Sequence, residues 1–357
     1  MNDIFLVFLY PQNHTNMKAL VKRYAKPGLW LEEVPMPEVG LNDVLIKVKK
    51  AAICGTDLHM YKWDEWSQLH CVPPYTMGHE FVGTVVDKGA GVQSVALGER
   101  VTAEGHIVCG HCRNCRRGMG HVCIHSKSVG IFGKDGAFAE YVVIPESNIV
   151  HLRDEIPDDF AAIMDPFGNA THTALSFPLL GEDVLVTGAG LIGTMAAGVC
   201  RFAGAKHIVV TDLNPLRLEI AKKMGATITV NEAAGETIDG AMKQLGIQGF
   251  DVGLEMSGAP SAFNEMIAHM YKGSNIAQLG ILPPNTHVNW SDVIFNALTI
   301  KGVTGRRMWE TWYQMEQMLL GGLDLSPVIT HHFAFEDFQK GFDVMVSGQC
   351  GKVILEL

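Results

Sequence analysis

The sequence predicts an α/β protein in two parts, a β-rich N-terminal part and a C-terminal part built on a doubly wound parallel sheet. The chain has 357 residues, 47% of them apolar, which suits two globular domains better than one core. Apolar and polar residues alternate between residues 18 and 49, as in short antiparallel strands. From residue 183 onward, strand and helix patterns follow one another, as in a parallel sheet covered by helices.

The N-terminal part begins with an apolar run at residues 4–10 that is too short to span a bilayer and has no preceding Lys or Arg. We therefore expect residues 1–16 to be an extension outside the fold, with Met17 as an alternative start. Pro35, Pro37 and Gly40 break the strand pattern between residues 18 and 49, and residues 81–86 continue it.

The first group of candidate metal ligands lies in the loops of this β-rich part. Cys54, His79 and Glu80 supply sulfur, nitrogen and oxygen, a set that leaves a position of a tetrahedral zinc open for substrate. Because adjacent side chains diverge in regular structure, His79 and Glu80 can both be ligands only in an irregular turn, so Glu80 is a conditional ligand. Taken singly, such residues are more often a buried thiol or a hydrogen-bonded imidazole than ligands. Thr56 and His59 follow the cysteine closely enough to form a proton route away from the metal.

The second group is a cluster of four cysteines, Cys109, Cys112, Cys115 and Cys123. Four thiolates in one loop fill every position of a tetrahedral ion, which predicts a closed structural zinc site. An iron–sulfur cluster is the competing interpretation, and the spacing before the fourth cysteine favours zinc. The four nearby histidines are expected to face solvent: His106, His111, His121 and His125.

Residues 157–170 connect the two parts and carry Asp165 directly before Pro166. A buried carboxylate at this boundary needs a partner, and a nearby metal would supply one. An ordinary Asp-Pro helix break explains the same pair, and local sequence does not separate the two interpretations.

The C-terminal part opens with a predicted strand, the run Gly188-Ala189-Gly190-Leu191-Ile192-Gly193, and a predicted helix. This context is required for a dinucleotide-binding turn of the Rossmann type, in which Gly188, Gly190 and Gly193 let the pyrophosphate approach a helix N-terminus. Asp212 ends the next strand, where it would hydrogen-bond the adenosine ribose and repel a 2′-phosphate, favouring NAD over NADP. Arg217 follows on the next helix and is expected to contact the adenosine end.

Ligands of a doubly wound sheet bind at the carboxyl ends of its strands. Five residues at two such ends are candidates for the nicotinamide side: Leu279, Gly280, Ile281, Val303 and Thr304. The tail from residue 309 mixes helix with a last strand near residues 352–355 and is expected to return to the first part. The expected domains are residues 17–164 joined by 305–357, and residues 165–304.

Composition excludes several classes of partner. The net charge is −10 and no run of Lys or Arg is present, which argues against a nucleic acid or a membrane surface. Half of the eight cysteines lie in the predicted zinc loop, so the chain is not a disulfide scaffold and suits a reducing compartment. A cytoplasmic protein with a small-molecule substrate is expected.

With both cysteine-containing motifs and the glycine turn in this order, the chain resembles the zinc-dependent medium-chain alcohol dehydrogenases from residue 17 to residue 357. The resemblance rests on long strings, including Cys54-Gly55-Thr56-Asp57-Leu58-His59, Trp63-Asp64-Glu65-Trp66-Ser67 and Asp165-Pro166-Phe167-Gly168-Asn169-Ala170. It implies a GroES-like catalytic domain, a Rossmann domain, NAD, two zinc ions per subunit and a homotetramer. It also implies that Thr56 and His59 relay the proton and that Asp165 assists near the catalytic zinc.

The resemblance further implies oxidation of L-threonine to L-2-amino-3-ketobutyrate with hydride transfer to NAD. A 2,3-butanediol or polyol dehydrogenase with the same machinery is the alternative. A non-catalytic NAD-binding protein is a third possibility, but it predicts the loss of a metal ligand. A threonine site must hold an ammonium, so Asp64 and Glu65 are candidates at the pocket mouth, with Trp63 and Trp66 offering aromatic faces. A solvated loop or subunit contact explains these four residues equally well.

Overall fold

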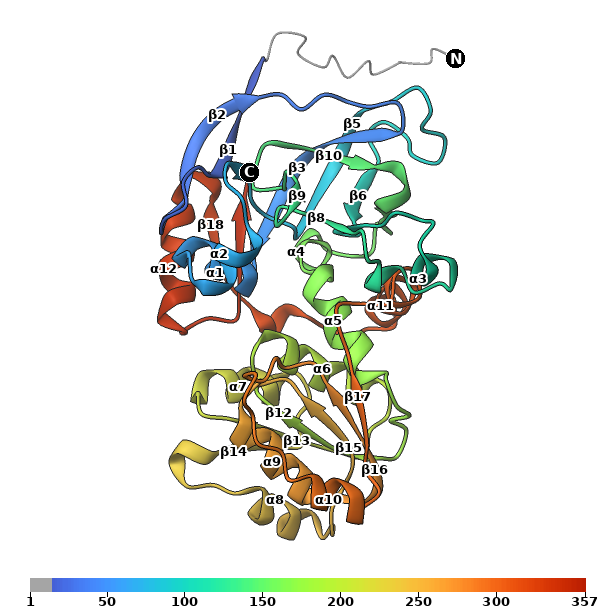
Figure 1. Cartoon of the computed structure of the whole chain (residues 1–357), viewed down its shortest axis with the longest axis vertical. Helices are drawn as coiled ribbons and strands as arrows, with labels where there is room; N and C mark the ends of the chain where they lie inside the picture. The colour runs from blue at the N-terminus through green and yellow to red at the C-terminus, as the bar shows by residue number, and fades with distance from the viewer. Residues whose placement is uncertain (1–14) are drawn as a thin grey trace.

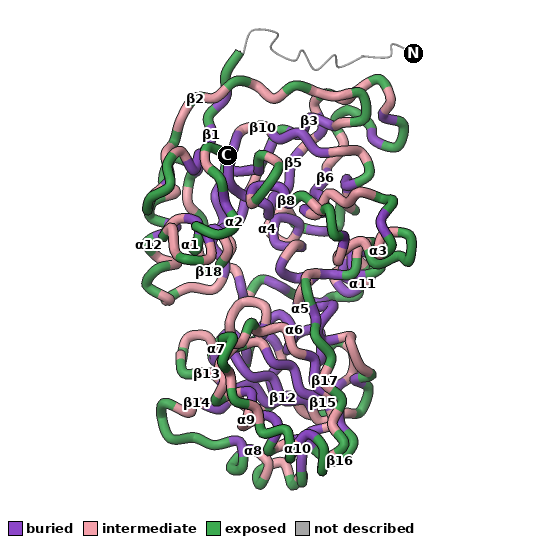
Figure 2. Tube along the Cα trace, in the orientation of Figure 1, coloured by how far each residue is buried: buried purple, intermediate pink, exposed green. Residues whose placement is uncertain are grey.

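The computed structural model describes residues 15–357, which form two lobes joined by a helix (Figure 1). The upper lobe contains the start of the described chain and also the C-terminus. The lower lobe contains a parallel sheet. Purple, buried tube is concentrated in the central strands of both lobes, and most of the green, exposed tube lies in the surrounding loops (Figure 2). Among the described residues, no helix has the length and apolar character needed to cross a membrane.

The chain enters the upper lobe through a small antiparallel sheet of order β2-β1-β4. Its strands are β1 Asn16–Lys22, β2 Trp30–Pro35 and β4 Tyr75–Thr76. The expectation that residues 15 and 16 belong to an extension is wrong, because Asn16 pairs with Pro35 and the carbonyl of Thr15 accepts a hydrogen bond from the N–H of Met36. The rest of the expected extension, residues 1–14, lies outside the described residues.

A seven-stranded sheet forms the core of the upper lobe, in the order β11-β6-β5-β3-β19-β18 with β10 also paired to β3. The central strand β3 is the longest, and its alternating apolar residues face a common core with those of β5 and β10. The strands are β3 Asp43–Ile53, β5 Phe81–Lys88, β6 Arg100–Ala103, β10 Tyr141–Pro145, β11 Ile149–His151, β18 Ile329–Ala334 and β19 Lys352–Glu356. The chain's last strand, β19, pairs antiparallel with β3, so the C-terminal segment returns to the upper lobe.

The lower lobe is a six-stranded parallel sheet in the order β14-β13-β12-β15-β16-β17. The sequence proceeds outward from β12 in one direction and then from β15 in the other, which is the doubly wound arrangement predicted from the sequence. Its strands are β12 Asp183–Thr187, β13 His207–Asp212, β14 Ile228–Asn231, β15 Phe250–Glu255, β16 Met270–Gln278 and β17 Thr299–Gly302. The helices of this lobe are α6 Leu191–Phe202, α7 Pro215–Lys223, α8 Ile238–Leu245, α9 Pro260–His269 and α10 Trp290–Phe295.

Helix α5, Met164–Ala174, runs between the lobes and packs against α6 and against α11, Glu310–Leu320. Phe167 of this helix shares one buried apolar cluster with Ala52 of β3 and Val186 of β12, so a continuous core joins the lobes. Pro166 lies in the first turn of α5, where a missing N–H costs nothing, so the Asp-Pro pair starts a helix rather than ending one. The remaining helices of the upper lobe include α4 Asp158–Ala162 and α12 Phe338–Ser347.

Candidate active site and metal centres

Cys54 is held at the start of a short helix, α1, Gly55–Lys62. It is the N-cap residue, and its backbone N–H donates to Oδ2 of Asp57 at 2.9 Å. This reciprocal capping arrangement fixes the turn that carries the thiol and buries the Asp57 carboxylate completely. Thr56, in the first turn of the same helix, lines one cavity with Cys54.

His79 and Glu80 lie in an irregular stretch between β4 and β5, as the ligand hypothesis for both residues requires. The stretch begins at Gly78, whose φ of +93° is readily available to glycine. A Cβ at this position would also lie 2.5 Å from the ring of Phe138. The turn therefore needs glycine, and it lets the two adjacent side chains approach the same point.

The ligand atoms of Cys54, His79 and Glu80 all lie within 4.8 Å of one another. Asp57 Oδ1 lies 3.6 Å from His79 Nδ1, and neither atom has a hydrogen-bond partner although both are buried. Burial opposes protonation of His79, but the negative charges of Asp57 and Cys54 raise its pKa to about 10. The negative charges that favour a proton on His79 would also favour a divalent cation. A thiolate, an imidazole and a carboxylate are ligands that suit zinc.

Glu80 also forms an ion pair with Lys352, whose Nζ lies 2.6 Å from Oε2. Lys352 is the first residue of β19, and its Nζ donates a second hydrogen bond to the carbonyl of Ile53. Both charged side chains are fully buried, so each offsets the desolvation of the other. The returning C-terminal strand thus competes with a metal for Glu80, a contact that sequence spacing could not reveal.

A cavity of about 150 Å³ opens beside these ligands. It is lined by Cys54, Thr56, His79, Gly105, His106, Ser128, Val129, Ile131, Asp165, Asn169, Gly305 and Arg306. The expectation that His106 faces solvent is wrong, because its ring is drawn toward the cavity by Glu104. Asn169, which the sequence did not single out as a site residue, presents a buried Oδ1 atom without a hydrogen-bond partner.

Asp165 is fixed by a buried network centred on Arg306. The guanidinium Nη2 of Arg306 lies 2.7 Å from Asp165 Oδ2, and its Nε lies 2.7 Å from Glu104 Oε2. Glu104 also accepts hydrogen bonds from Trp312 and His106. Burial opposes ionisation of Glu104, but Arg306 and His106 lower its pKa to about 2. The network spans more than 200 residues of sequence, which explains why spacing did not predict it.

Gly168 shows how closely α5 approaches this network. A Cβ at residue 168 would lie 2.5 Å from Cδ of Arg306, so the absence of a side chain lets the arginine pass beneath the helix. One helical turn aligns Asp165 with Asn169, and both residues line the cavity. Within this segment, Gly168 leaves room for Arg306, while Asp165 and Asn169 face the cavity.

His59 lies later on α1 and is not among the residues that line the cavity. Its side chain is 57% exposed, and its Nδ1 is hydrogen-bonded to Oδ2 of Asp64. Neither Asp64 nor Glu65 lines the cavity, so the hypothesis that these two acids bind the substrate ammonium at the pocket mouth is not supported. Trp63 instead faces the ammonium of Lys22, which lies 4.9 Å from its ring centroid.

The four clustered cysteines surround a single point in the loop of the upper lobe that contains α3, Arg113–Arg116. The Sγ atoms of Cys112 and Cys115 are 3.5 Å apart, as are those of Cys109 and Cys123, and other pairs are 4.0 Å apart. Zinc with Zn–S bonds of about 2.3 Å separates its sulfurs by about 3.8 Å, so these distances fit one tetrahedral ion. The backbone N–H of Cys115 donates to Cys112 and lowers the pKa of that thiol to about 6.

A second cavity, of about 640 Å³, lies at the carboxyl ends of β12, β13 and β15. Gly188, Gly190, Asp212 and Arg217 line it, together with polar residues that the sequence did not single out, among them Glu232, Ser257 and Gln349. Asp212 accepts hydrogen bonds from the N–H groups of Ala189 and Asn214. This carboxylate therefore connects the glycine turn to the next strand, where a ribose hydroxyl would meet it.

Gly193 and Ile192 lie in the first turn of α6, behind the glycine turn. A Cβ on Gly193 would lie 2.0 Å from the carbonyl oxygen of Gly188, so glycine permits the close packing of helix and strand. Leu279, Gly280 and Ile281 follow the end of β16, and Val303 and Thr304 follow the end of β17. None of these five residues lines the cavity around Asp212.

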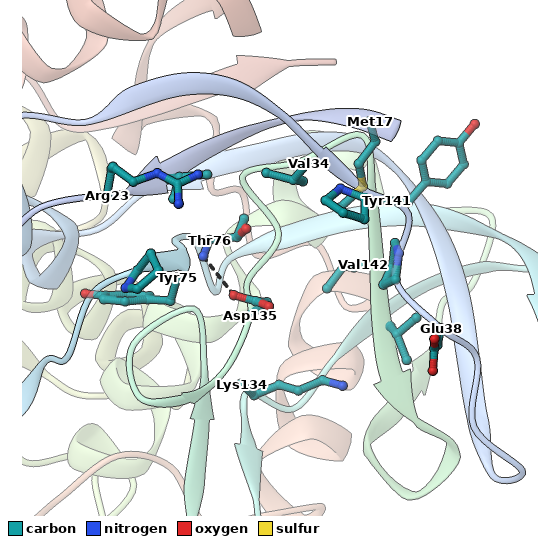
Figure 3. A pocket seen from close by; sticks show the side chains of 15 residues that line it. Met17, Arg23, Val34, Glu38, Tyr75, Thr76, Lys134, Asp135, Tyr141 and Val142 are labelled. Atoms are coloured by element: carbon teal, nitrogen blue, oxygen red, sulfur yellow. Dashed lines mark hydrogen bonds between the residues drawn. The ribbon is translucent and has the colours of Figure 1, made fainter. Parts of the chain in front are cut away.

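A third hollow, of about 520 Å³, lies away from both sites (Figure 3). Met17, Arg23, Tyr75, Lys134 and Asp135 are among the side chains around it, and Asp135 accepts a hydrogen bond from the N–H of Thr76. None of its lining residues belongs to either group of metal ligands or to the dinucleotide cavity.

A parallel-sheet lobe with a glycine turn, joined to a β-rich lobe with two cation sites, defines a class of metal-dependent dehydrogenase. Residues 40–154 match the alcohol dehydrogenase GroES-like domain, and residues 192–321 match the zinc-binding dehydrogenase domain. The chain belongs to this zinc-binding dehydrogenase family.

The chain is 58% identical over 340 residues to the L-threonine 3-dehydrogenase of Shewanella sp. strain ANA-3, covering 95% of this chain and 99% of that one. Two solved structures are also similar. A short chain alcohol dehydrogenase from E. coli complexed with NADH is 28% identical, with a TM-score of 0.87 over 96% of this chain and all of the other. The 2R,3R-butanediol dehydrogenase of Bacillus subtilis is 25% identical, with a TM-score of 0.86 over 96% and 99% of the two chains.

Proposed function

We propose that the protein is an L-threonine 3-dehydrogenase that oxidises L-threonine to L-2-amino-3-ketobutyrate and transfers the hydride to NAD. The observation that carries this proposal is the 58% identity to an enzyme of that name over nearly the whole of both chains. The likeness to 2R,3R-butanediol dehydrogenase has a comparable extent but only 25% identity, so a diol substrate is the second candidate. A non-catalytic role is disfavoured because Cys54, His79 and Asp212 are all present.

Cys54 and His79 would hold the catalytic zinc, and Glu80, which also pairs with Lys352, would be a conditional third ligand. When bound, zinc acts as a Lewis acid that lowers the pKa of the substrate hydroxyl, and NAD accepts the hydride. Thr56 lines the cavity and orients that hydroxyl through its own Oγ. His59 takes the departing proton toward solvent. Cys109, Cys112, Cys115 and Cys123 hold the structural zinc.

The cavity beside the zinc ligands suits the ammonium of threonine. Asp165 offers a carboxylate there, and Asn169 offers an amide oxygen that has no partner. Both atoms accept hydrogen bonds, and an ammonium is a donor only. Asp165 already pairs with Arg306, so an ammonium would be its second cationic partner and would also satisfy the free Oδ1 of Asn169, which favours an amino alcohol.

Gly188, Gly190, Asp212 and Arg217 line one cavity, where Asp212 would bind the ribose of the dinucleotide and Arg217 its adenosine end. A carboxylate at this position binds two hydroxyl groups and repels a 2′-phosphate, so NAD is preferred over NADP. Ile192 and Gly193 support the turn from α6. The nicotinamide end would be bound by residues that follow the ends of β16 and β17: Leu279, Gly280, Ile281, Val303 and Thr304.

The assembly is a homotetramer in the cytoplasm. Strand β17 forms one edge of the six-stranded sheet, and the exposed apolar side chains of Trp290, Ile294 and Phe295 lie on α10 directly before it. An open sheet edge beside apolar side chains favours pairing with a second copy. Residues 17–164 and 305–357 form the catalytic domain of each subunit, and residues 165–304 form the NAD-binding domain.

The test is to incubate the purified zinc-loaded enzyme with L-threonine and NAD and to identify the products. We expect one NADH for each molecule of L-2-amino-3-ketobutyrate. The Cys54→Ser variant, which lacks a proposed zinc ligand, should form no NADH. NADH formation without this ketone would contradict the assignment of the substrate.

A further inference from the structure

Asp64 has two separate contacts, one with each carboxylate oxygen. Its Oδ1 accepts hydrogen bonds from the backbone N–H and the hydroxyl of Ser67, at 3.1 and 3.2 Å, and so caps helix α2, Glu65–His70. Its Oδ2 is hydrogen-bonded to Nδ1 of His59. One oxygen therefore anchors the side chain while the other meets the imidazole.

The backbone between the two helices brings Asp64 back over His59. Helix α1 ends at Lys62, and Trp63 adopts a left-handed conformation with a φ of +55°, from which its N–H donates to the carbonyl of His59 at 2.9 Å. The ring of Trp66 packs 6.0 Å from the ring of His59, and His70 stacks on the Trp66 ring. Among the described residues, Asp64 is the charged group paired with His59.

We propose that Asp64 is a positioning residue that fixes the tautomer of the relay histidine. An ionised carboxylate only accepts hydrogen bonds, so Nδ1 of His59 must carry the hydrogen that Asp64 receives. A neutral imidazole has one N–H, and its Nε2 is then a free acceptor. This inference deepens the proposed function and rests on it, because the relay has a purpose only when a hydroxyl is oxidised.

The proton balance of this step is simple. The O–H bond of the substrate breaks, and the proton delivered to His59 forms a bond with the Nε2 lone pair. The imidazolium carries one positive charge beside the Asp64 carboxylate, and it returns to neutrality when Nε2 releases the same proton to water. No electrons are exchanged at His59, since the hydride leaves with the dinucleotide.

The substitution that tests the inference is Asp64→Asn. Asparagine keeps an oxygen that can cap Ser67, but its amide nitrogen would donate to Nδ1 of His59. His59 would then carry its hydrogen on Nε2, where it cannot accept a proton. We expect kcat near neutral pH to fall by about ten- to hundredfold, with the KM for NAD within about twofold of wild type, and imidazole or high pH to restore most of the rate.

Glu65→Gln is the matched control, because it removes the same charge from the next residue. Glu65 is exposed and begins α2, and no hydrogen bond or ion pair joins its side chain to another described residue. This variant should keep a kcat close to wild type. An equal loss in Glu65→Gln would assign the effect to the general negative charge of this segment and would overturn the proposal.

A double-mutant cycle separates positioning from helix capping. In a His59→Ala background, Asp64→Asn should cause no further loss of kcat, because the histidine that it acts on is absent. Additive losses, a loss that imidazole fails to restore, or an unchanged kcat in Asp64→Asn alone would each overturn the proposal. A wild-type enzyme that is inactive on L-threonine would instead contradict the proposed function.

Discussion

At the scale of single residues, the active site depends on buried charges that are balanced within a few ångströms. Glu104, Arg306 and Asp165 form one such set, and Glu80 with Lys352 forms another. Removing one member leaves the other charge buried without a partner, which costs more than the pair itself contributes. The position of Asp165 in the cavity is therefore determined by Arg306, which Glu104 holds from the other side.

Glu104→Gln should destabilise the protein by roughly 3 to 5 kcal/mol at neutral pH, because Arg306 loses one of its two carboxylates. Glu104 has a pKa lowered from 4.5 to about 2, so its ionisation stabilises the fold above pH 4.5. That stabilisation, about 3 kcal/mol, is lost as the pH falls through 2. Denaturant unfolding of both proteins from pH 7 downward should show their difference shrinking below pH 4.5.

The control for Glu104→Gln is Glu155→Gln, which removes an exposed carboxylate. It should leave the free energy of unfolding within about 0.5 kcal/mol of wild type. A difference between wild type and Glu104→Gln that stays constant from pH 7 to pH 3 would mean that Glu104 does not ionise as described.

Asp212→Ala should reduce the preference for NAD over NADP, because it removes both the acceptor for the ribose hydroxyls and the charge that repels a 2′-phosphate. We expect the specificity constant for NAD to fall by about ten- to hundredfold, a loss typical of charge-assisted hydrogen bonds, while that for NADP changes little or rises. Steady-state kinetics with both dinucleotides measures this. An unchanged ratio would show that Asp212 does not face the ribose.

At the scale of elements, the two cation sites differ in how they are built. Cys54 caps a helix and meets His79 from a separate turn, so the fold assembles that site. The four clustered cysteines lie in one loop around α3, so residues close in sequence assemble that site. Zinc binding should therefore be part of the folding free energy of this loop, but mainly a catalytic requirement at Cys54.

This contrast predicts opposite outcomes for two serine substitutions. Cys54→Ser should abolish turnover while shifting the thermal midpoint by no more than a few degrees. Cys112→Ser should lower the thermal midpoint first, because it removes a ligand from a closed site. Calorimetry, activity and zinc content, measured on both variants, decide the matter, and the reverse pattern would exchange the assignments of the two sites.

At the scale of the whole molecule, the parts that the sequence predicted are those with local signatures. The glycine turn, the strand that ends at Asp212 and the cysteine loop each depend on residues close in sequence. The contacts of Glu104 with Arg306, and of Glu80 with Lys352, join residues more than 200 positions apart. Their partners are fixed only when β19 pairs with β3 and α5 meets α11, so no spacing rule reveals them.

The same limit applies to Asp64. Its acidity suggested a role in binding the substrate ammonium, but its partner depends on the left-handed conformation of Trp63, which turns the chain back toward His59. Non-glycine residues rarely adopt this conformation, so the sequence did not predict the turn. Asn169 was missed as a site residue because its role depends on an unpartnered amide oxygen inside the cavity.

The assembly is testable at this scale through α10 and β17. Phe295 is 81% exposed, and replacing it with aspartate should weaken association of the subunits by placing a charge in the apolar contact. Leu97→Asp is the control, since Leu97 is also exposed but lies in the upper lobe. Sedimentation velocity should show a smaller species for Phe295→Asp alone; a tetramer unaffected by Phe295→Asp would place the interface elsewhere.

The cavity beside Cys54, His79 and Glu80 should select an amino alcohol over a diol. The most direct measurement is NAD reduction by the zinc-loaded enzyme with L-threonine, 2,3-butanediol and sorbitol, compared as kcat/KM. The account predicts a specificity constant for L-threonine at least about a hundredfold above the others, since a diol leaves Asp165 and Asn169 without an ammonium. A higher constant for either 2,3-butanediol or sorbitol would contradict it.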